Sequence, residues 1–411
     1  MTFLSYSAPR QNEMPSCCRS LGDWLARKLS RVTSSGEFIP EIDGLRFIAI
    51  MVVIFHHLMA SYLLNTRRFG VVHLPDDWYR LSAESPLVHF ISRGYFGVHL
   101  FFVISGFILA LPFARTHLAA APGPRLKSYY LRRLTRLEPP YVLNLVLCFL
   151  YIWMTDPGRQ MFVPHFVASL FYAHGLVYGS ASWINGVAWS LEVEVQFYLL
   201  VPLLATVFGI RNGPIRRTIL IGSILLFGCA SQWIIPNAAS GRLNLSLLNF
   251  VQYFLAGLLL ADLYLTGWMD KRTSYRWDLA VLLSGLMMLA IMLRFPHRAY
   301  LLPFVILLFY WSVFRGKISN TVIRLTPIVI LGGICYTTYL YHNFVILFMD
   351  WAIIQFASSS RSFSLDFLLF ALIQLPVIFL VCALLFVYTE KPFMKPWARI
   401  PAWKRSAVAV S

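Results

Sequence analysis

Two basic side chains lie in the first apolar segment of the chain, where an ionisable group is costly. Arg46 and His57 are eleven residues apart. On a helix, two residues at this spacing point in directions only about 20° apart and are separated by about 16 Å along the axis. They therefore lie on one stripe of the helix surface, whereas His56 lies about 80° from that stripe. Because an ionisable group inside a bilayer is by default a functional-site candidate, we predict that Arg46 and His57 face one interior site. The alternatives are that Arg46 snorkels at the cytosolic edge and that His57 is a hydrogen-bonded packing residue.

Two carboxylates open a later apolar segment, in the run WSLEVEVQFY that covers residues 189–198. Glu192 and Glu194 are two residues apart, about 200° on a helix, so at most one of them can point into a helix bundle. The helical rise, counted from the ends of the two segments, puts Glu194 and His57 in the same outer half of the bilayer. A carboxylate and an imidazole at one depth predict an acid/base pair, and a structural ion pair is the alternative.

Guanidinium groups gather before the third apolar segment. Arg133 and Arg136 are three residues apart, on one helix face, with Arg132 beside them and Pro139-Pro140 after them. Planar guanidinium groups match the oxygens of phosphate, so we interpret the run as a phosphate-binding clamp. A purely topogenic and lipid-contacting role is the alternative.

Four further side chains are candidate substrate contacts. The small pair Ser105-Gly106 would let a neighbouring helix or a ligand approach closely. Tyr339 and His342 share one face of a tyrosine-rich segment, and Trp189 opens the segment that carries the two carboxylates. We select Ser105, Tyr339, His342 and Trp189 on these grounds, with packing as the alternative.

Residue spacing argues against several cofactors and against a metal site. His57, His99 and His342 lie singly on three segments, whereas a transmembrane di-haem needs paired histidines on each of two helices. The chain has no HExxH motif, no Cys/His cluster, no GxxxxGK[ST] loop and no GxGxxG after a strand. Its six cysteines show no metal-binding spacing, and we interpret them as packing residues. No metal and no permanently bound cofactor is predicted.

The composition shows what kind of element holds these residues. Of the 411 residues, 58% are hydrophobic and only 13% are charged, about half the charge of a soluble globular chain, and the mean hydropathy is +0.65. These values exclude a water-soluble enzyme and predict an all-α, polytopic helical membrane protein. The net charge of +17 does not indicate a nucleic-acid partner, because the basic residues lie in short loops where the positive-inside rule accounts for them.

About ten transmembrane helices are predicted, and the distribution of charge predicts their orientation. With a cytosolic N-terminus, about 25 Lys and Arg fall in the inner segments and about 9 in the outer ones. Both termini are therefore expected in the cytosol and residues 155–188 outside. An eleventh apolar piece, from His165 to Gly179, would reverse this balance if it crossed, so we predict a re-entrant or interfacial segment there. The ten spans begin near Leu45, Gly94, Tyr141, Trp189, Arg217, Leu245, Trp277, Tyr300, Pro327 and Leu365.

Three regions follow from these spans. Residues 1–40 form an N-terminal cytosolic segment, in which apolar residues at helical spacing suggest a basic helix on an anionic leaflet; a frayed tail is the alternative. Residues 41–395 form the transmembrane domain, and residues 396–411 form a basic cytosolic tail that is too short to fold alone. We see no internal repeat of the kind that marks many transporters.

Taken in order, these segments resemble the motifs of the acyltransferase-3 family, bacterial membrane-bound O-acyltransferases that act on saccharides. The resemblance covers about residues 41–395 and is specific in combination rather than in any single motif. The matching segments are DGLRFIAIMVVIFHH, GVHLFFVISGF, RRLTRLEPPY, WSLEVEVQFY, YTTYLYH and the closing EKP. Four positions depart from the family's usual residues, namely His99 for aspartate, Glu192 for serine, Val195 for glutamate and Cys335 for serine.

The resemblance implies an acyltransferase domain over residues 41–395. Such a domain would transfer an acyl group, commonly acetyl, from acyl-coenzyme A to a hydroxyl of an envelope or exported saccharide, free or lipid-linked. It also implies that Arg46 and His57 are the essential pair, and that Arg133, Arg136 and Glu194 match motif positions.

Physical chemistry is consistent with these implied roles. Coenzyme A is cytosolic and polyanionic, so its phosphates should dock on the cytosolic cluster of Arg46, Arg132, Arg133 and Arg136. A neutral His57 can then take the proton of the acceptor hydroxyl, with Glu194 setting its tautomer; a covalent acyl intermediate is a second route.

Two other functions compete with acyl transfer. A multi-span transporter of a polar or anionic solute would also bury an arginine and carboxylates, and a catalytically inactive sensor or scaffold would keep the fold. The ordered motifs and the absence of a repeat argue against the transporter, and the presence of both Arg46 and His57 argues against the scaffold. We therefore expect a multi-pass enzyme of the cell inner membrane with a saccharide and membrane lipids as partners, its oligomeric state left open by the sequence.

Overall fold

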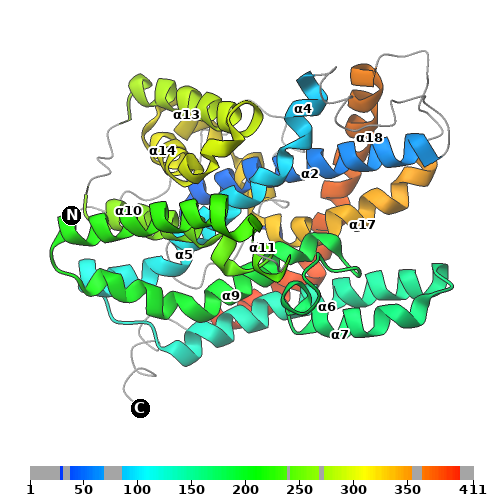
Figure 1. The fold of residues 1–411 in the computed structure, drawn as a ribbon, viewed down its shortest axis with the longest axis horizontal. Helices are drawn as coiled ribbons and strands as arrows, with labels where there is room; N and C mark the ends of the chain where they lie inside the picture. The colour runs from blue at the N-terminus through cyan, green and yellow to red at the C-terminus, as the bar shows by residue number, and fades with distance from the viewer. Residues whose placement is uncertain are drawn as a thin grey trace, which may run out of the picture.

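The described chain is built from helices. The computed structural model describes residues 28–30, 38–68, 86–237, 241–267, 273–353 and 363–398, and apart from one isolated bridge between Ser274 and Gly316 its regular elements are helical (Figure 1). The longer helices are α2 (Pro40–Arg68), α5 (Gly97–Leu118), α6 (Leu126–Thr155), α9 (Trp189–Leu204), α10 (Gly213–Cys229), α12 (Val251–Leu265), α13 (Tyr275–Leu293), α14 (Leu302–Arg315), α17 (Cys335–Ile353) and α18 (Phe363–Leu385).

The ten predicted spans all coincide with helices of the described chain. Within the described residues, eight helical stretches are long and apolar enough to cross a bilayer, and a bent pair, α16 (Thr326–Gly333) with α17, raises that number to nine. The remaining predicted span, near Leu245, corresponds to α12, which is apolar but only 15 residues long. The prediction of an all-α polytopic membrane protein is confirmed.

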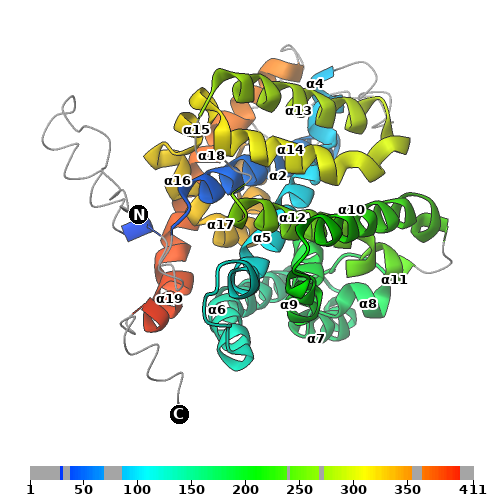
Figure 2. The same cartoon turned by 90° about the vertical axis from the view of Figure 1, so that its left-hand side faces the viewer.

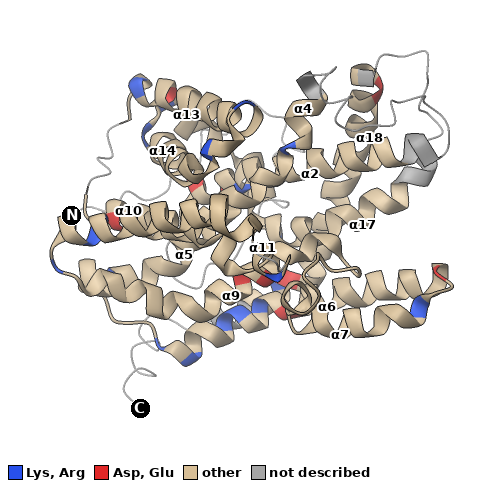
Figure 3. Ribbon diagram, in the orientation of Figure 1, with Lys and Arg blue, Asp and Glu red and all other residues tan. Residues whose placement is uncertain are grey.

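The helix that carries the third predicted span is longer than the span. α6 runs without a break from Leu126 to Thr155, through Pro139-Pro140, so the predicted start near Tyr141 lies inside a longer helix. Figure 3 shows Lys and Arg along the N-terminal half of this helix. The arginines of the predicted clamp therefore belong to the span's own helix rather than to a loop before it, and their positions are set by the packing of that helix.

Tyrosines of α17 donate hydrogen bonds to the proline-containing part of α6. A proline inside a helix lacks the N–H group that would bond one turn back. The hydroxyl of Tyr336 donates to the carbonyl oxygen of Leu137 (2.8 Å), and that of Tyr341 donates to the carbonyl oxygen of Pro140 (2.9 Å). These contacts join the tyrosine-rich segment to the run that carries the two prolines.

α12 is short and lies wholly inside the protein. Its residues from Val251 to Leu263 are all buried, and Figure 2 shows it between α5 and α10. A Cβ atom on Gly106 of α5 would overlap the carbonyl oxygen of Phe254, and one on Gly257 of α12 would overlap the carbonyl oxygen of Val103. The small pair predicted to allow close approach thus serves helix packing through its glycine.

The predicted single span near Pro327 is broken in two. α16 and α17 meet at a bend of 73°, between Gly333 and Cys335. α16 lies close against α2, because a Cβ atom on Gly332 would overlap the backbone carbonyl of Asp43. The break leaves the first turn of α17, with Cys335 buried, in the interior of the bundle.

The eleventh apolar piece forms two short helices, α7 (Phe162–Leu170) and α8 (His174–Tyr178), joined at a turn in which Tyr172 has φ +54°. Neither is long enough to cross a bilayer. His165 and His174 meet there through Nδ1 and Nε2 (2.8 Å), and burial lowers the pKa of both imidazoles. This geometry agrees with the predicted re-entrant or interfacial segment.

Some predictions concern residues that are not described. The N-terminal basic helix and the C-terminal tail lie almost entirely outside the described residues, as do large parts of the outer segments 65–93 and 349–363. Their predicted structures remain predictions.

The orientation of the bundle also remains a prediction, with a direct test. We expect a membrane-impermeant thiol reagent, added from outside, to label a cysteine at Gly158 but not one at Pro214, in a background without native cysteines. Both positions are exposed in the structure, so accessibility within the protein does not bias the comparison. Labelling of both, or of Pro214→Cys alone, would contradict a cytosolic N-terminus with ten crossings.

Candidate functional site

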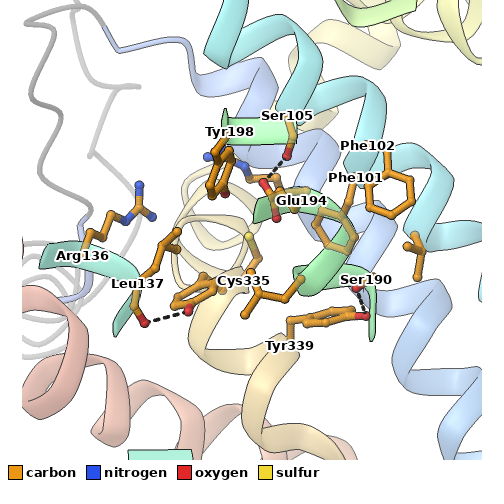
Figure 4. Close-up of a pocket in the computed structure, with 14 residues that line it drawn as sticks. Phe101, Phe102, Ser105, Arg136, Leu137, Ser190, Glu194, Tyr198, Cys335 and Tyr339 are labelled. Carbon is orange, nitrogen blue, oxygen red and sulfur yellow. Dashed lines mark hydrogen bonds between the residues drawn. The ribbon is translucent and has the colours of Figure 1, made fainter. Parts of the chain in front are cut away.

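One cavity collects polar side chains from five helices. It has a volume of about 110 Å³ and is lined by residues of α2, α5, α6, α9 and α17 (Figure 4). Its wall is largely apolar and aromatic, with a few polar groups directed into it. The polar residues on which the following argument depends are Arg46, Ser105, Arg136, Glu194, Tyr198 and Tyr339.

Arg46 enters the cavity from α2. Its guanidinium donates to Oδ1 of Asp43 at 2.6 Å, three residues earlier on the same helix. The Asp43 side chain is 1% exposed and that of Arg46 is 13% exposed, so the ion pair lies in the interior rather than at the protein surface. Arg46 therefore does not snorkel away from the bundle, and its positive charge is held at the cavity wall.

Glu194 is the one carboxylate among the described residues that line the cavity. The hydroxyl of Ser105 donates to Glu194 Oε1 at 2.6 Å, and Figure 4 shows the two side chains directed at one another. Tyr198, one turn later on α9, lies on the same wall. The two residues of the Ser105-Gly106 pair on α5 therefore have different roles: Gly106 packs against α12, and Ser105 faces the cavity.

Arg136 is anchored by a buried carboxylate from the far end of the chain. Its Nε and Nη2 both donate to Oε1 of Glu390, at 3.1 and 2.9 Å. Glu390 is fully buried, and its Oε2 accepts a hydrogen bond from Thr337 at 2.7 Å. The Arg136 side chain is 31% exposed, so this network leaves part of the guanidinium on the cavity side. The closing EKP segment thus supplies the residue that positions Arg136.

Arg133 lies behind the cavity wall. Its guanidinium carbon is 3.7 Å from the centre of the Tyr129 ring and 5.9 Å from that of Tyr198, a cavity residue. Nη1 donates to the carbonyl oxygen of Tyr129 (3.1 Å), whereas the buried Nε has no hydrogen-bond partner among the described residues. Arg132, its neighbour on α6, does not line the cavity.

His57 pairs with a second histidine. Nδ1 of His57 is 3.0 Å from Nε2 of His342, and the ring centres are 4.9 Å apart. His56 points elsewhere, with its Nδ1 3.2 Å from the carbonyl oxygen of Ile91. Arg46 lines the cavity to which α17 contributes and His57 hydrogen-bonds to α17, so both lie toward that helix, whereas His56 does not. That Arg46 and His57 serve one site remains a prediction.

The histidine pair adjoins the cavity. His342 lies one turn beyond Tyr339, and the centres of the two rings are 6.0 Å apart. Tyr339 is itself fixed, since its hydroxyl donates to the carbonyl oxygen of Val187 at 2.9 Å and contacts Ser190. α17 thus carries both a cavity wall and the partner of His57.

The structure divides the predicted site residues into three groups. Arg46, Ser105, Arg136, Glu194 and Tyr339 line the cavity, and His57 with His342 adjoins it. Arg132, Arg133 and Trp189 do not line it, and Trp189 instead packs against Phe250 and Phe102 with ring centres 5.3 and 6.4 Å away. His57 and Glu194, predicted to pair, have separate hydrogen-bond partners.

Several residues of the site were not selected from the sequence. Tyr198 follows Glu194 by four residues and Asp43 precedes Arg46 by three, so helical spacing would have found both. Cys335, interpreted as a packing residue, lies in the cavity wall because of the break before α17. The link from Glu390 to Arg136 had no local signal, because it joins two distant parts of the chain. No group of three or more His, Cys, Asp or Glu in the described chain is arranged to hold a metal ion.

Comparisons with known proteins place this arrangement in context. A family model described as an acyltransferase domain matches residues 39–387. The O-acetyltransferase OatA of Staphylococcus aureus (strain NCTC 8325 / PS 47) is 25% identical over 342 residues, which cover 77% of this chain and 52% of the relative. The peptidoglycan O-acetyltransferase OatA of Listeria monocytogenes (serovar 1/2a, strain ATCC BAA-679 / EGD-e) is 26% identical over 205 residues, 47% of this chain and 28% of the relative. The chain thus spans about half the length of the first of these curated relatives. No solved structure matches the chain significantly.

Proposed function

The chain belongs to the acyltransferase-3 family, and from this premise we propose that it is an O-acetyltransferase of the cell inner membrane. In this proposal it moves an acetyl group from acetyl-coenzyme A to a hydroxyl of an envelope saccharide, free or lipid-linked. The names of the relatives support the reaction and the class of acceptor. The observation that carries the proposal is the convergence of motifs from α2, α5, α6, α9 and α17 on one cavity.

The cavity suits the reactive end of the donor. At about 110 Å³ it is smaller than the roughly 300–1,000 Å³ of sites that enclose a whole ligand. The slender thioester end of acetyl-coenzyme A can enter a space of this kind, while the nucleotide stays outside it. We assign the binding of the donor's phosphates to Arg136, which is partly exposed, and to Arg133, one turn earlier on the same helix.

The proposed chemistry is direct acyl transfer. The acceptor oxygen attacks the thioester carbonyl carbon while the imidazole of His57 takes the hydroxyl proton. Collapse of the tetrahedral intermediate breaks the carbon–sulfur bond, and the proton returns to the leaving sulfur. The products are an O-acetyl ester and coenzyme A. Arg46 lies about 16 Å along α2 from His57, too far for both to act on one carbonyl group, so we assign Arg46 to holding the donor.

Mass spectrometry of the cell's own envelope saccharides tests this function. Cells that carry the gene are expected to contain a saccharide with additional acetyl mass that is released by mild base, as an ester is. The same species should lose that mass on deletion and regain it with the wild-type gene but not with the His57→Ala variant. An unchanged saccharide profile after deletion would contradict the proposed acceptor class.

The donor site predicts a selective loss of affinity. Arg133→Ala and Arg136→Ala should each weaken the binding of acetyl-coenzyme A by about 1–3 kcal/mol, because each removes charge-assisted contacts with phosphate. Arg136→Ala also leaves the buried carboxylate of Glu390 without its positively charged partner. The Arg136→Gln/Glu390→Gln double variant is therefore the matched test, because it removes both charges together. Binding of coenzyme A to detergent-solubilised protein is the measurement. Unchanged binding in all three variants would assign these arginines to topology and packing.

A further inference from the structure

The hydrogen bonds around His57 and His342 determine which nitrogen of each ring carries a proton. This information goes beyond the proposed function. Three observations bear on this: the backbone acceptors around His342, its burial, and the acceptors around His57.

The first ring is fixed by backbone carbonyls. Nδ1 of His342 lies 3.0 Å from the carbonyl oxygen of Thr338 and 2.8 Å from that of Tyr339. A carbonyl oxygen only accepts hydrogen bonds, so Nδ1 of His342 must carry the proton. His342 is fully buried, and its described hydrogen-bond partners are two carbonyls and His57, none of them a carboxylate. A buried imidazolium without a counter-charge is disfavoured, so the ring is neutral and Nε2 holds a lone pair.

The second ring follows from the first. Nε2 of His342 is 3.0 Å from Nδ1 of His57, and because it accepts, Nδ1 of His57 donates. The carbonyl oxygen of Val53, also 3.0 Å from that Nδ1, independently requires a proton there. A neutral His57 protonated on Nδ1 has its lone pair on Nε2, and no described residue hydrogen-bonds to that atom. Nε2 is therefore the basic nitrogen.

We propose that His342 is a positioning residue that holds His57 in the tautomer protonated on Nδ1, so that Nε2 is the atom that takes the acceptor's proton. The proposal rests on the proposed function for the use of that proton, but the tautomer itself does not depend on it. When His57 becomes protonated, the lone pair of His342 Nε2 continues to accept from Nδ1–H and stabilises the imidazolium. In this arrangement a neutral imidazole does what Glu194 was expected to do from the sequence.

Two variants of His342 separate this role from packing. His342→Phe keeps the ring and loses the acceptor nitrogen, whereas His342→Gln keeps an amide oxygen that can accept from His57. We expect His342→Phe to lower kcat on the order of 10²-fold, because general-base catalysis that depends on the correct tautomer is lost. The KM for acetyl-coenzyme A should stay within about threefold of the wild-type value, since His342 does not line the cavity. The kcat of His342→Gln should be at least tenfold higher than that of His342→Phe.

Nitrogen NMR of the protein labelled with ¹⁵N-histidine provides a readout that is independent of activity. The His57 signals, identified by their disappearance in His57→Gln, should show a protonated Nδ1 and an unprotonated Nε2 in the wild-type protein, and a mixture of tautomers in His342→Phe. A His57 protonated on Nε2 in the wild type would overturn the proposal, even if His342→Phe fails to fold. So would His342→Phe with kcat within threefold of wild type. If the wild type transfers no acetyl group but shows the expected tautomer, the proposed function fails and the assignment of the histidine pair stands.

Discussion

His57→Ala should abolish acetyl transfer, whereas His56→Ala should retain a substantial fraction of it. The two histidines are adjacent in sequence, but only His57 faces α17 and hydrogen-bonds to His342, while His56 contacts the carbonyl of Ile91. Loss of a general base commonly lowers the rate about 10²–10⁴-fold. The measurement is the initial rate with labelled acetyl-coenzyme A, at matched amounts of protein in the membrane.

The paired design supplies its own control. His56→Ala makes a similar change in side-chain volume one position away on the same helix, so a loss due to helix destabilisation should affect both variants. An active His57→Ala with an inactive His56→Ala would show that the catalytic face of α2 has been assigned to the wrong side.

Glu194→Gln should be severely impaired and Glu192→Gln only mildly. Glu194 is the carboxylate of the described cavity wall and accepts a hydrogen bond from the hydroxyl of Ser105. The amide keeps the shape but removes the negative charge that faces the cavity, which Glu194 shares with Arg46. We expect kcat to fall on the order of 10²-fold, with the KM for acetyl-coenzyme A changed much less.

Glu192 is the matched control because it lies on the same helix with a different partner. It is buried, and its Oε2 accepts the backbone N–H of Gly175 at the start of α8 (2.8 Å). An amide oxygen can accept the same bond, so Glu192→Gln should keep most of the activity. Equal losses in the two variants would mean that Glu194 acts through structure rather than through its charge.

The positions of spans and the faces of single helices could be read from the sequence. The separation of Arg46 and His57 predicted that they share one stripe of their helix, because helical geometry alone determines the angle between two residues on one helix. Apolar length likewise predicted the positions of the ten spans. The helix of the third span is longer than the span predicted near Tyr141, because α6 continues through Pro139-Pro140 back to Leu126.

Contacts between helices were beyond the reach of the same reasoning. Glu194 and His57 were expected to pair because they share a depth, but depth says nothing about lateral position, and each has another partner. His342 reaches His57 because α17 packs against α2 after the 73° bend. Glu390 reaches Arg136 across most of the length of the chain. Such partners depend on how the helices pack, which no local pattern encodes.

The most direct test of the central claim, that this chain is an acyltransferase, is to follow both ends of a labelled thioester. Purified protein in liposomes is supplied with acetyl-coenzyme A labelled in the acetyl group, with the saccharide fraction of the source cell's envelope as acceptor. We expect labelled acetyl ester on the saccharide and an equal amount of free coenzyme A with the wild-type protein, and neither with His57→Ala. A wild-type protein that leaves the thioester intact, or that moves solute across the liposome membrane without releasing coenzyme A, would contradict the claim and identify the chain as a binding protein or a transporter.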